Sequence, residues 1–408
     1  MTLRKRPLDI TALAGGAFRD AQFRLFFIGI FFAVQAIWVQ RVTLGWLAWE
    51  RTGSAAFVGL VAGLSLAPAL VLGPLFGVMT DRVDIRRAAF TTNALMAVVL
   101  ALLAISLPFT GSLALALAAF AIGLISAAHH PVRMSLGPRL VPVSEVRHVV
   151  SVAALNFNLA RLVAPVLAGA VIANLGAGVA LWVSVLCYVP MLIVLPRLRP
   201  RALPPRPRAS VFADLREGLV YAVRAPVVRL ALTITLIFST IVRGALEVLP
   251  VLADGAFDKG AAGLGVLTAA AGAGAVSSAA LKASGVGASG ASIPPAVLWA
   301  AALGQGAVIA MGLSPGWYAA ILATAVAGFC ATWVGVSMQS AIQTDLPDEY
   351  RGRVMSLWVV AGFGAVALGA FGIGGLGEVL GIGTALALAG AGGIMVLGAL
   401  ILGVQARR

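Results

Sequence analysis

The sequence predicts an all-α polytopic membrane protein whose twelve transmembrane helices form two six-helix bundles. Hydrophobic residues make up 61% of the 408 residues, charged residues make up 11%, and the mean hydropathy is +1.01. A soluble fold of this length cannot bury so much apolar surface, so lipid must be the solvent for most of the chain. The apolar residues fall into long runs, and most basic residues lie between alternate runs. These observations predict both the helix count and the orientation.

About twelve apolar runs approach the roughly 20 residues that a membrane-spanning helix requires. No run alternates polar and apolar residues with a period of two, which excludes a transmembrane β-barrel. Glycine and proline occur within the runs, and helices in lipid tolerate both. The predicted spans are residues 25–49, 55–79, 88–108, 111–129, 150–174, 178–195, 229–252, 262–281, 293–312, 316–340, 354–377 and 381–403.

The distribution of lysine and arginine predicts the orientation. An even number of helices places both termini on one side, and that side carries all but five of the basic residues. Basic residues mark the cytoplasmic side, so we expect both termini in the cytoplasm and the chain in the cytoplasmic (inner) membrane. Met1 to Arg24 is basic but has no short apolar stretch before a small-residue cleavage site, so we expect no removed signal peptide. The five exceptions are Arg41, Arg51, Arg161, Arg243 and Lys259.

The longest polar stretch separates six spans from six. It begins with a Pro/Arg-rich segment at 200–208, which is typical of a semi-rigid linker. Apolar residues then recur at near-helical spacing between 211 and 223, which predicts an amphipathic helix on the membrane surface. The predicted domains are an N-terminal bundle at 1–196, a cytoplasmic linker at 197–228 and a C-terminal bundle at 229–408.

A weak internal repeat also favours two related halves. Leu-Val-Pro at 140–142 precedes Glu145 and Arg147 between the fourth and fifth spans. Leu-Pro-Asp-Glu at 346–349 precedes two arginines between the tenth and eleventh spans. The two segments lie about half a chain apart, as duplicated bundles require.

A charged segment, Gly77-Val78-Met79-Thr80-Asp81-Arg82-Val83-Asp84-Ile85-Arg86-Arg87, separates the second and third spans. Its glycine, first aspartate and three arginines fit the pattern Gly-x-Leu-Ala-Asp-Arg-x-Gly-Arg-Arg, and in this the chain resembles a major facilitator superfamily transporter. Asp84 stands where that family usually has glycine, a variant that resembles the branch of enterobactin-type siderophore exporters and macrolide-efflux-like proteins. Segments 38–46, 51–54, 156–169 and 347–354 also match, so the resemblance extends from the first span to the eleventh.

The resemblance implies that this segment is a conformational latch. The first residues of the eleventh span leave backbone N–H groups free, and the helix dipole stabilises a carboxylate beside them. We expect Asp81 to supply that carboxylate when the bundles close on the cytoplasmic side, with the arginines paired to Asp345, Asp348 or Glu349. The alternative is that these charges are solvated topology markers. The predicted latch residues are Gly77, Asp81, Arg82, Arg86 and Arg87.

Ionisable residues inside the predicted spans are strong functional candidates because their burial in lipid is costly. Glu247 is the only carboxylate well inside a span, so we expect it to carry a coupling proton. Arg243 lies one helical turn before it, and the alternative is that the two residues merely neutralise each other. Family architecture places the first, fourth, seventh and tenth spans around a central cavity, which implies that Arg41, Arg243 and Glu247 face substrate.

Polar and aromatic residues of the first and tenth spans complete the expected cavity. The alternative is that many of them anchor helices at the interface or form interhelical hydrogen bonds. The cavity candidates are Gln35, Trp38, Gln40, Arg41, Arg243, Trp333, Gln339 and Gln343. In the fifth span we expect Arg161 and Asn156 to lock helices together, and the interface candidates are Asn156, Arg161, Pro165 and Gly169.

The other motifs do not favour an enzyme, a cofactor or a metal site. The G-x-G-x-x-G pattern at 372–377 lies in a predicted span with no preceding strand, so we reject a dinucleotide site. His129 and His130 have no third metal ligand nearby in the sequence, and the two cysteines, Cys187 and Cys330, lie inside apolar runs. No phosphate-binding Gly-Lys-Ser/Thr motif occurs, which argues against an ATP-driven pump. The basic residues are explained by topology, so we expect no nucleic-acid partner.

The predicted function is secondary active transport by alternating access, with a proton-coupled exporter of a small molecule as the leading hypothesis. The excess of intramembrane arginine over glutamate suits an anionic or polar substrate such as a siderophore or other metabolite. An amphipathic drug or a lipid, including a lysophospholipid, is the alternative cargo. A non-transporting scaffold or receptor of the same fold is a further alternative, and an intact latch argues against it. We expect a monomer.

Overall fold

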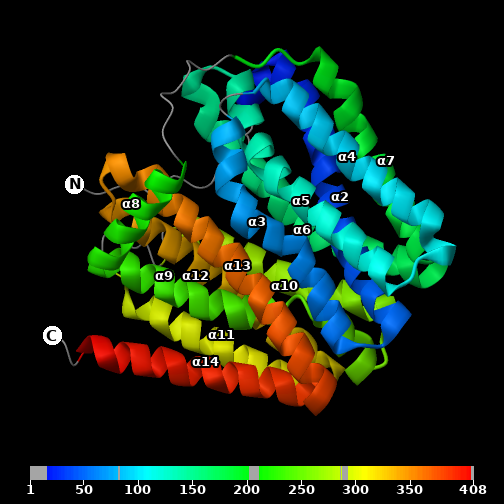
Figure 1. Cartoon of the computed structure of the whole chain (residues 1–408), viewed down its shortest axis with the longest axis vertical. Coiled ribbons are helices and arrows are strands. Elements are labelled where there is room, and N and C mark those ends of the chain that lie inside the picture. The colour runs from blue at the N-terminus through cyan, green and yellow to red at the C-terminus, as the bar shows by residue number, and fades with distance from the viewer. Residues whose placement is uncertain (1–15, 81–82, 202–210, 285, 287–292, 406–408) are drawn as a thin grey trace.

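The computed structural model describes residues 16–80, 83–201, 211–284, 286 and 293–405, and helices make up nearly all of them (Figure 1). Twelve segments are long and apolar enough to cross a membrane, and each overlaps one predicted span. The described part of the chain contains no β-strand. The α-helices are α2 (Ala21–Thr52), α3 (Ala55–Thr80), α4 (Ile85–Ser106), α5 (Ser112–Leu136), α6 (Val146–Leu175), α7 (Ala177–Val194), α8 (Val211–Arg224), α9 (Pro226–Phe238), α10 (Gly260–Ala283), α11 (Pro295–Gly312), α12 (Trp317–Asp345), α13 (Asp348–Leu380) and α14 (Ile382–Gln405).

Local sequence explains where the first long helix begins and ends. The Asp20 carboxylate accepts a hydrogen bond of 2.7 Å from the backbone N–H of Gln22 and so caps the start of α2. Gly53 ends the helix in the left-handed conformation, with φ of 59°, and its N–H donates to the Trp49 carbonyl at 2.8 Å. Only a short connection therefore separates α2 from α3, which run in opposite directions.

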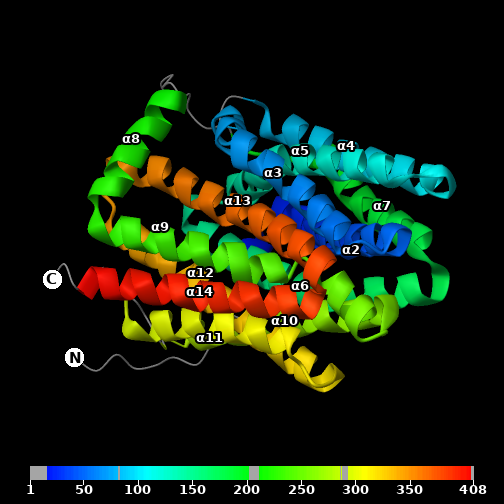
Figure 2. The same cartoon turned by 60° about the horizontal axis from the view of Figure 1, so that its bottom comes forward.

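The helices form two groups of six membrane spans, as predicted. In the first half α2 packs on α6 and α7, and α4 packs on α5 and α7; in the second half α12 packs on α10 and α11, and α11 packs on α14. The halves meet where α3 packs on α13 and α6 packs on α10. Figures 1 and 2 both show α3 alongside α13.

The bundle has two ends, which we name by their loops. The Gly53 end holds the connections between α2 and α3, between α4 and α5, and between α13 and α14. The linker end holds the connections between α3 and α4 and between α12 and α13, together with α8.

The seventh span differs from a regular helix over 229–252. The α-helix α9 stops at Phe238 and a π-helical turn, η6, follows at Ser239–Arg243. Residues 246–248 form a turn and bend, and a second π-helical segment, η7, occupies Val251–Ala256. Apolar composition alone does not reveal where the backbone hydrogen-bond ladder shifts. Such π-helical and broken segments occur often at functional sites, including the binding sites of transporters.

The helix expected in the linker is α8, and it packs against the start of α13. The Glu217 carboxylate forms a 2.7 Å ion pair with the Arg353 guanidinium. The rings of Tyr221 and Tyr350 stack with centroids 4.5 Å apart. Figure 2 shows α8 crossing the second half at the linker end, beyond the start of α9.

Candidate functional site

A cavity of about 270 Å³ lies between the two halves. One wall is His130 of α5 in the first half, and the others come from η6, α12 and α13 in the second half. The indole N–H of Trp358 is buried and has no hydrogen-bond partner among the described residues, so it remains available to a ligand. The lining residues are His130, Arg243, Gln339, Trp358, Val359, Gly362 and Phe363.

An ion pair joins the halves beside this cavity. Arg41 of α2 contacts Glu247 through both its Nη2 and its Nε, and the Nε donates to Oε2 at 3.3 Å. The Glu247 side chain is 11% exposed, so most of its carboxylate is shielded from solvent. In a regular helix Glu247 would lie one turn after Arg243, on the same face. Here Glu247 lies in the turn that follows η6, so this regular spacing is lost. Glu247 therefore forms its ion pair with the opposite half of the molecule.

The Trp38 ring connects this ion pair to α6. Two guanidinium carbons lie over this ring, that of Arg41 at 5.4 Å and that of Arg161 at 5.8 Å from the ring centroid. Phe157 packs on the same indole with ring centroids 5.6 Å apart. Arg161 in turn interacts electrostatically with Arg243, Arg41 and Glu247. Two aromatic rings and several guanidinium groups therefore lie near the centre of the molecule.

The remaining cavity candidates occupy different environments. Arg243 and Gln339 line the cavity, whereas Gln40 is buried in the first half, where its side-chain oxygen accepts a 3.2 Å hydrogen bond from the Tyr188 hydroxyl. Trp333 is buried with the Lys282 ammonium 4.2 Å from its ring centroid. Gln35 is partly buried and Gln343 is exposed.

The interface candidates of α6 lie against two different helices. The Asn156 amide donates to the Ile30 carbonyl of α2 at 3.3 Å, within the first half. Gly169 faces α10 so closely that an added Cβ would lie 2.6 Å from the Ala261 carbonyl oxygen. An added Cβ on Gly265 of α10 would lie 2.7 Å from the Pro165 carbonyl oxygen. The two halves thus meet backbone to backbone where α6 crosses α10.

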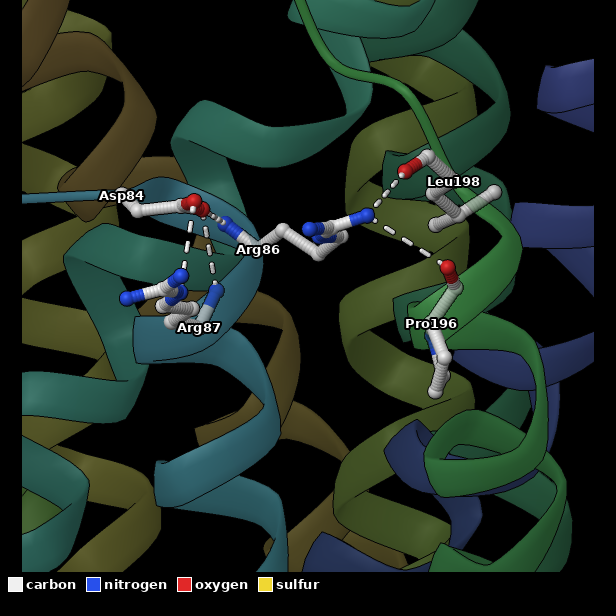
Figure 3. Close-up of polar contacts among 5 residues, drawn as sticks. All are labelled: Asp84, Arg86, Arg87, Pro196 and Leu198. Atoms are coloured by element: carbon white, nitrogen blue, oxygen red, sulfur yellow. Dashed lines mark hydrogen bonds and ion pairs between the residues drawn. The ribbon is translucent and has the colours of Figure 1, made fainter.

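The predicted latch is only partly within the described structure. Asp81 and Arg82 lie outside the described residues, as do the side chains of Asp345, Asp348 and Glu349. The two remaining arginines contact Asp84, Pro196 and Leu198, as Figure 3 shows.

Asp84 and the arginines that follow it organise the start of α4. The Asp84 carboxylate accepts hydrogen bonds from the backbone N–H groups of Arg86, at 2.9 Å, and Arg87, at 3.1 Å. The Arg86 guanidinium donates to the carbonyls of Pro196 and Leu198, each at 3.4 Å (Figure 3). The aspartate that departs from the family pattern is therefore a helix N-cap, and Arg86 ties α4 to the segment after α7.

Removing this cap should lower the stability of the protein. We expect Asp84→Ala to cost about 0.5–2 kcal/mol, because two backbone N–H groups lose their acceptor. Thermal unfolding of the detergent-solubilised protein measures the effect, with Asp84→Asn as the control that keeps a capping oxygen. Equal melting temperatures for wild type and Asp84→Ala would show that the cap contributes nothing.

Further polar contacts join the halves at the Gly53 end, and the sequence analysis did not identify them. Glu378, near the end of α13, accepts hydrogen bonds from the Ser54 hydroxyl at 2.9 Å and the Ala56 backbone N–H at 3.2 Å. The Trp49 indole donates to Asp254 at 2.7 Å. The sequence feature that points to them is that Glu378 and Asp254 are acidic and lie just outside predicted spans. The Glu378 carboxylate thus caps the first turn of a helix from the other half.

Glycines bring α13 into close contact with α3 and with the seventh span. A Cβ on Gly374 of α13 would lie 2.5 Å from the Ala55 carbonyl oxygen and 3.1 Å from Gly59. A Cβ on Gly244 of the seventh span would lie 2.8 Å from Gly369 of α13. No group of three or more potential metal ligands occurs within the described ranges.

Comparisons with known proteins agree with this geometry. Residues 11–407 match a family model described as "Transmembrane secretion effector". The enterobactin exporter EntS of Escherichia coli O1:K1 / APEC is 27% identical over 362 residues, which cover 86% of this chain and 80% of that protein. EntS of Escherichia coli O81 (strain ED1a) is 27% identical over 365 residues with the same coverage.

Solved structures share the fold. The nucleoside transporter NupG (D323A mutant) superposes with a TM-score of 0.73 at 11% identity, covering 93% of this chain and 99% of that one. The human organic anion transporter MFSD10 (TETRAN) gives a TM-score of 0.67 at 18% identity, covering 93% of this chain and 98% of that one. The chain therefore belongs to the transmembrane secretion effector family of major facilitator superfamily transporters, in the branch that contains the enterobactin exporters.

Proposed function

We propose that this transporter exports a small molecule by alternating access and couples export to proton entry. The observation that carries the proposal is the asymmetry between the two ends of the molecule. The contacts that Glu378, Asp254 and Glu247 make with the first half lie toward the Gly53 end. The cavity lies toward the linker end, because its lining residues His130, Gln339 and Trp358 belong to the linker-end parts of their helices. The export direction is supported by the enterobactin-exporting relatives.

Two carboxylates at opposite ends of the molecule provide a structural basis for the alternation between the two states. Glu378, at the end of α13, caps the first turn of α3 when the halves meet at the Gly53 end. The predicted latch is the converse arrangement, with Asp81 after α3 placed at the first turn of α13. The two contacts exclude each other if the halves rock about the central cavity, because closing one end separates the other. The binding of substrate and proton would then bias the populations of the two states.

The Arg41–Glu247 pair links this motion to a proton. While the halves meet at the Gly53 end, Arg41 neutralises the Glu247 carboxylate. Separation of α2 from the seventh span removes that cation, and the carboxylate takes a proton from the side to which the Gly53 end has opened. On return, the Arg41 guanidinium displaces that proton into the cavity water and restores the ion pair. One proton thus enters for each cycle that carries substrate outward.

The orientation follows from the basic residues. We propose that the linker end faces the cytoplasm of the inner membrane with both termini, because lysine and arginine concentrate there. The Gly53 end then faces outward. We further propose a monomer whose functional units are the bundles 1–196 and 229–408, joined by the linker 197–228.

Transport in everted membrane vesicles tests this function. With the linker end outward, an imposed inside-acid gradient should drive at least one of a panel of siderophores, drugs, lysophospholipids and anionic metabolites into the vesicles. Vesicles without the protein are the control. Accumulation that ignores the gradient would contradict proton coupling, and accumulation only in right-side-out vesicles would contradict export.

A further inference from the structure

The charges at the centre of the molecule do not balance. Arg41, Arg161 and Arg243 come from three different spans and interact electrostatically with one another and with Glu247. Glu247 is engaged by Arg41. Within the described ranges no carboxylate forms an ion pair with either Arg161 or Arg243. Arg161 and Arg243 therefore carry positive charges that no described ion pair neutralises.

An uncompensated guanidinium inside the membrane is unfavourable. Burying a charged side chain at the centre of a membrane-spanning helix is costly, and like charges at low dielectric repel each other in addition. Such residues therefore mark ligand or ion pathways by default. Arg243 lines the cavity, and Arg161 interacts electrostatically with Arg243. The missing negative charge is best supplied by a bound ligand.

Aromatic groups surround these cations. Trp358 and Phe363 line the cavity together with Arg243. The Trp38 ring lies against the Arg161 guanidinium, 5.8 Å from centroid to guanidinium carbon. His130 contributes a ring from the other half, edge-on to Phe363 with centroids 6.1 Å apart. Stacking surfaces of this kind favour a flat ligand, and the free indole N–H of Trp358 adds a hydrogen-bond donor.

The size of the cavity limits the ligand. A volume of about 270 Å³ lies just below the roughly 300–1,000 Å³ typical of drug-sized sites. A ligand of one or two fused rings with small substituents fits within this volume.

We propose that the cavity binds a planar aromatic compound carrying two carboxylates, one for Arg161 and one for Arg243. This assignment rests on the proposed transport function and names the substrate class for the same site. A guanidinium presents paired N–H donors that match the two oxygens of a carboxylate, and its planar face also stacks on aromatic rings. A ligand that contacts His130 and Arg243 together bridges the two halves.

Binding to the full chain in phosphatidylcholine nanodiscs tests the assignment by calorimetry. The probe is naphthalene-2,6-dicarboxylate, compared with naphthalene-2-carboxylate, which has one charge, and cyclohexane-1,4-dicarboxylate, which has no aromatic ring. We expect the aromatic dicarboxylate to bind at least tenfold more tightly than either. Equal affinity for the monocarboxylate would overturn the two-charge assignment, and equal affinity for the cyclohexane compound would overturn the aromatic one. These comparisons use wild-type protein alone.

Substitutions then assign the charges to residues. Arg243→Gln and Arg161→Gln should each weaken dicarboxylate binding at least tenfold and abolish the preference over the monocarboxylate. Arg243→Lys should retain that preference in part. The matched control is Arg147→Gln, an exposed arginine outside the cavity, which should bind as wild type does. Wild-type affinity in either glutamine variant of the central arginines would overturn the proposal.

Transport separates this inference from the function on which it rests. Tight binding of the dicarboxylate without its movement in vesicles would retain the site and reject the transport role. Proton-driven export of a monovalent or cationic compound that is indifferent to Arg243→Gln would retain the transport role and reject the substrate class.

Discussion

Glu247→Gln is expected to abolish proton-driven accumulation while leaving substrate exchange intact. The amide keeps the size of the side chain and one oxygen that can accept a hydrogen bond from Arg41, but it no longer releases a proton when the halves close. Everted vesicles carrying this variant should therefore accumulate no more substrate under an imposed pH gradient than protein-free vesicles do. Exchange of labelled for unlabelled substrate across the same membrane should continue, because it needs no net proton movement.

The control for this variant is a carboxylate outside the ion pair. Glu50 of α2 is exposed near the Gly53 end and accepts a 3.0 Å hydrogen bond from the Trp46 indole of its own helix. Glu50→Gln should retain gradient-driven accumulation. Full accumulation in Glu247→Gln would exclude this carboxylate as the proton carrier, and loss of both accumulation and exchange would indicate a structural role.

Gly374→Leu should prevent the Gly53 end from closing and thereby stop transport. An added Cβ already meets the Ala55 carbonyl oxygen at 2.5 Å, and backbone atoms cannot move aside as a flexible side chain does. Overpacking of this kind costs about 1–3 kcal/mol, which corresponds to a shift of about 5–150-fold in the population of the closed state. Substrate accumulation in everted vesicles measures the loss.

A glycine of the same helix provides the matched control. Gly372 is exposed, and a Cβ added there meets nothing within 4 Å. Gly372→Leu should therefore transport as wild type does. If Gly374→Leu also transported normally, close approach of α3 and α13 would not be required for the cycle.

The fold could be predicted from the sequence because each membrane span can be recognised independently of the others. Each of the twelve apolar runs needs only length and composition to be recognised, and all twelve correspond to membrane spans in the structure. The Asp81–Arg87 segment and four other matching segments also predicted the superfamily and its branch, which the family comparison supports.

The site was harder to predict because it depends on contacts between distant segments. Glu247 and Arg243 are four residues apart, but the helix is interrupted between them and Glu247 forms its ion pair with Arg41. Glu378 contacts Ser54 at the start of α3 although the two residues are 324 positions apart in the sequence. Neither segment alone predicts this contact. His130, for which the sequence predicted no role, lines the cavity, since only packing of the halves brings it to the same cavity as Trp358. Long-range pairing of this kind has no periodic signature.

Alternating access is the central claim, and paired distance measurements in nanodiscs test it most directly. Spin labels at Val83 and Gln343 report on the linker end, and labels at Phe109 and Val379 report on the Gly53 end; all four positions are exposed, and Cys187 and Cys330 are first replaced by serine. We predict two populations of inter-label distance for each pair. Acidification should lengthen the Phe109–Val379 distance and shorten the Val83–Gln343 distance. Distances that stay fixed at both ends, or that lengthen together, would contradict alternating access.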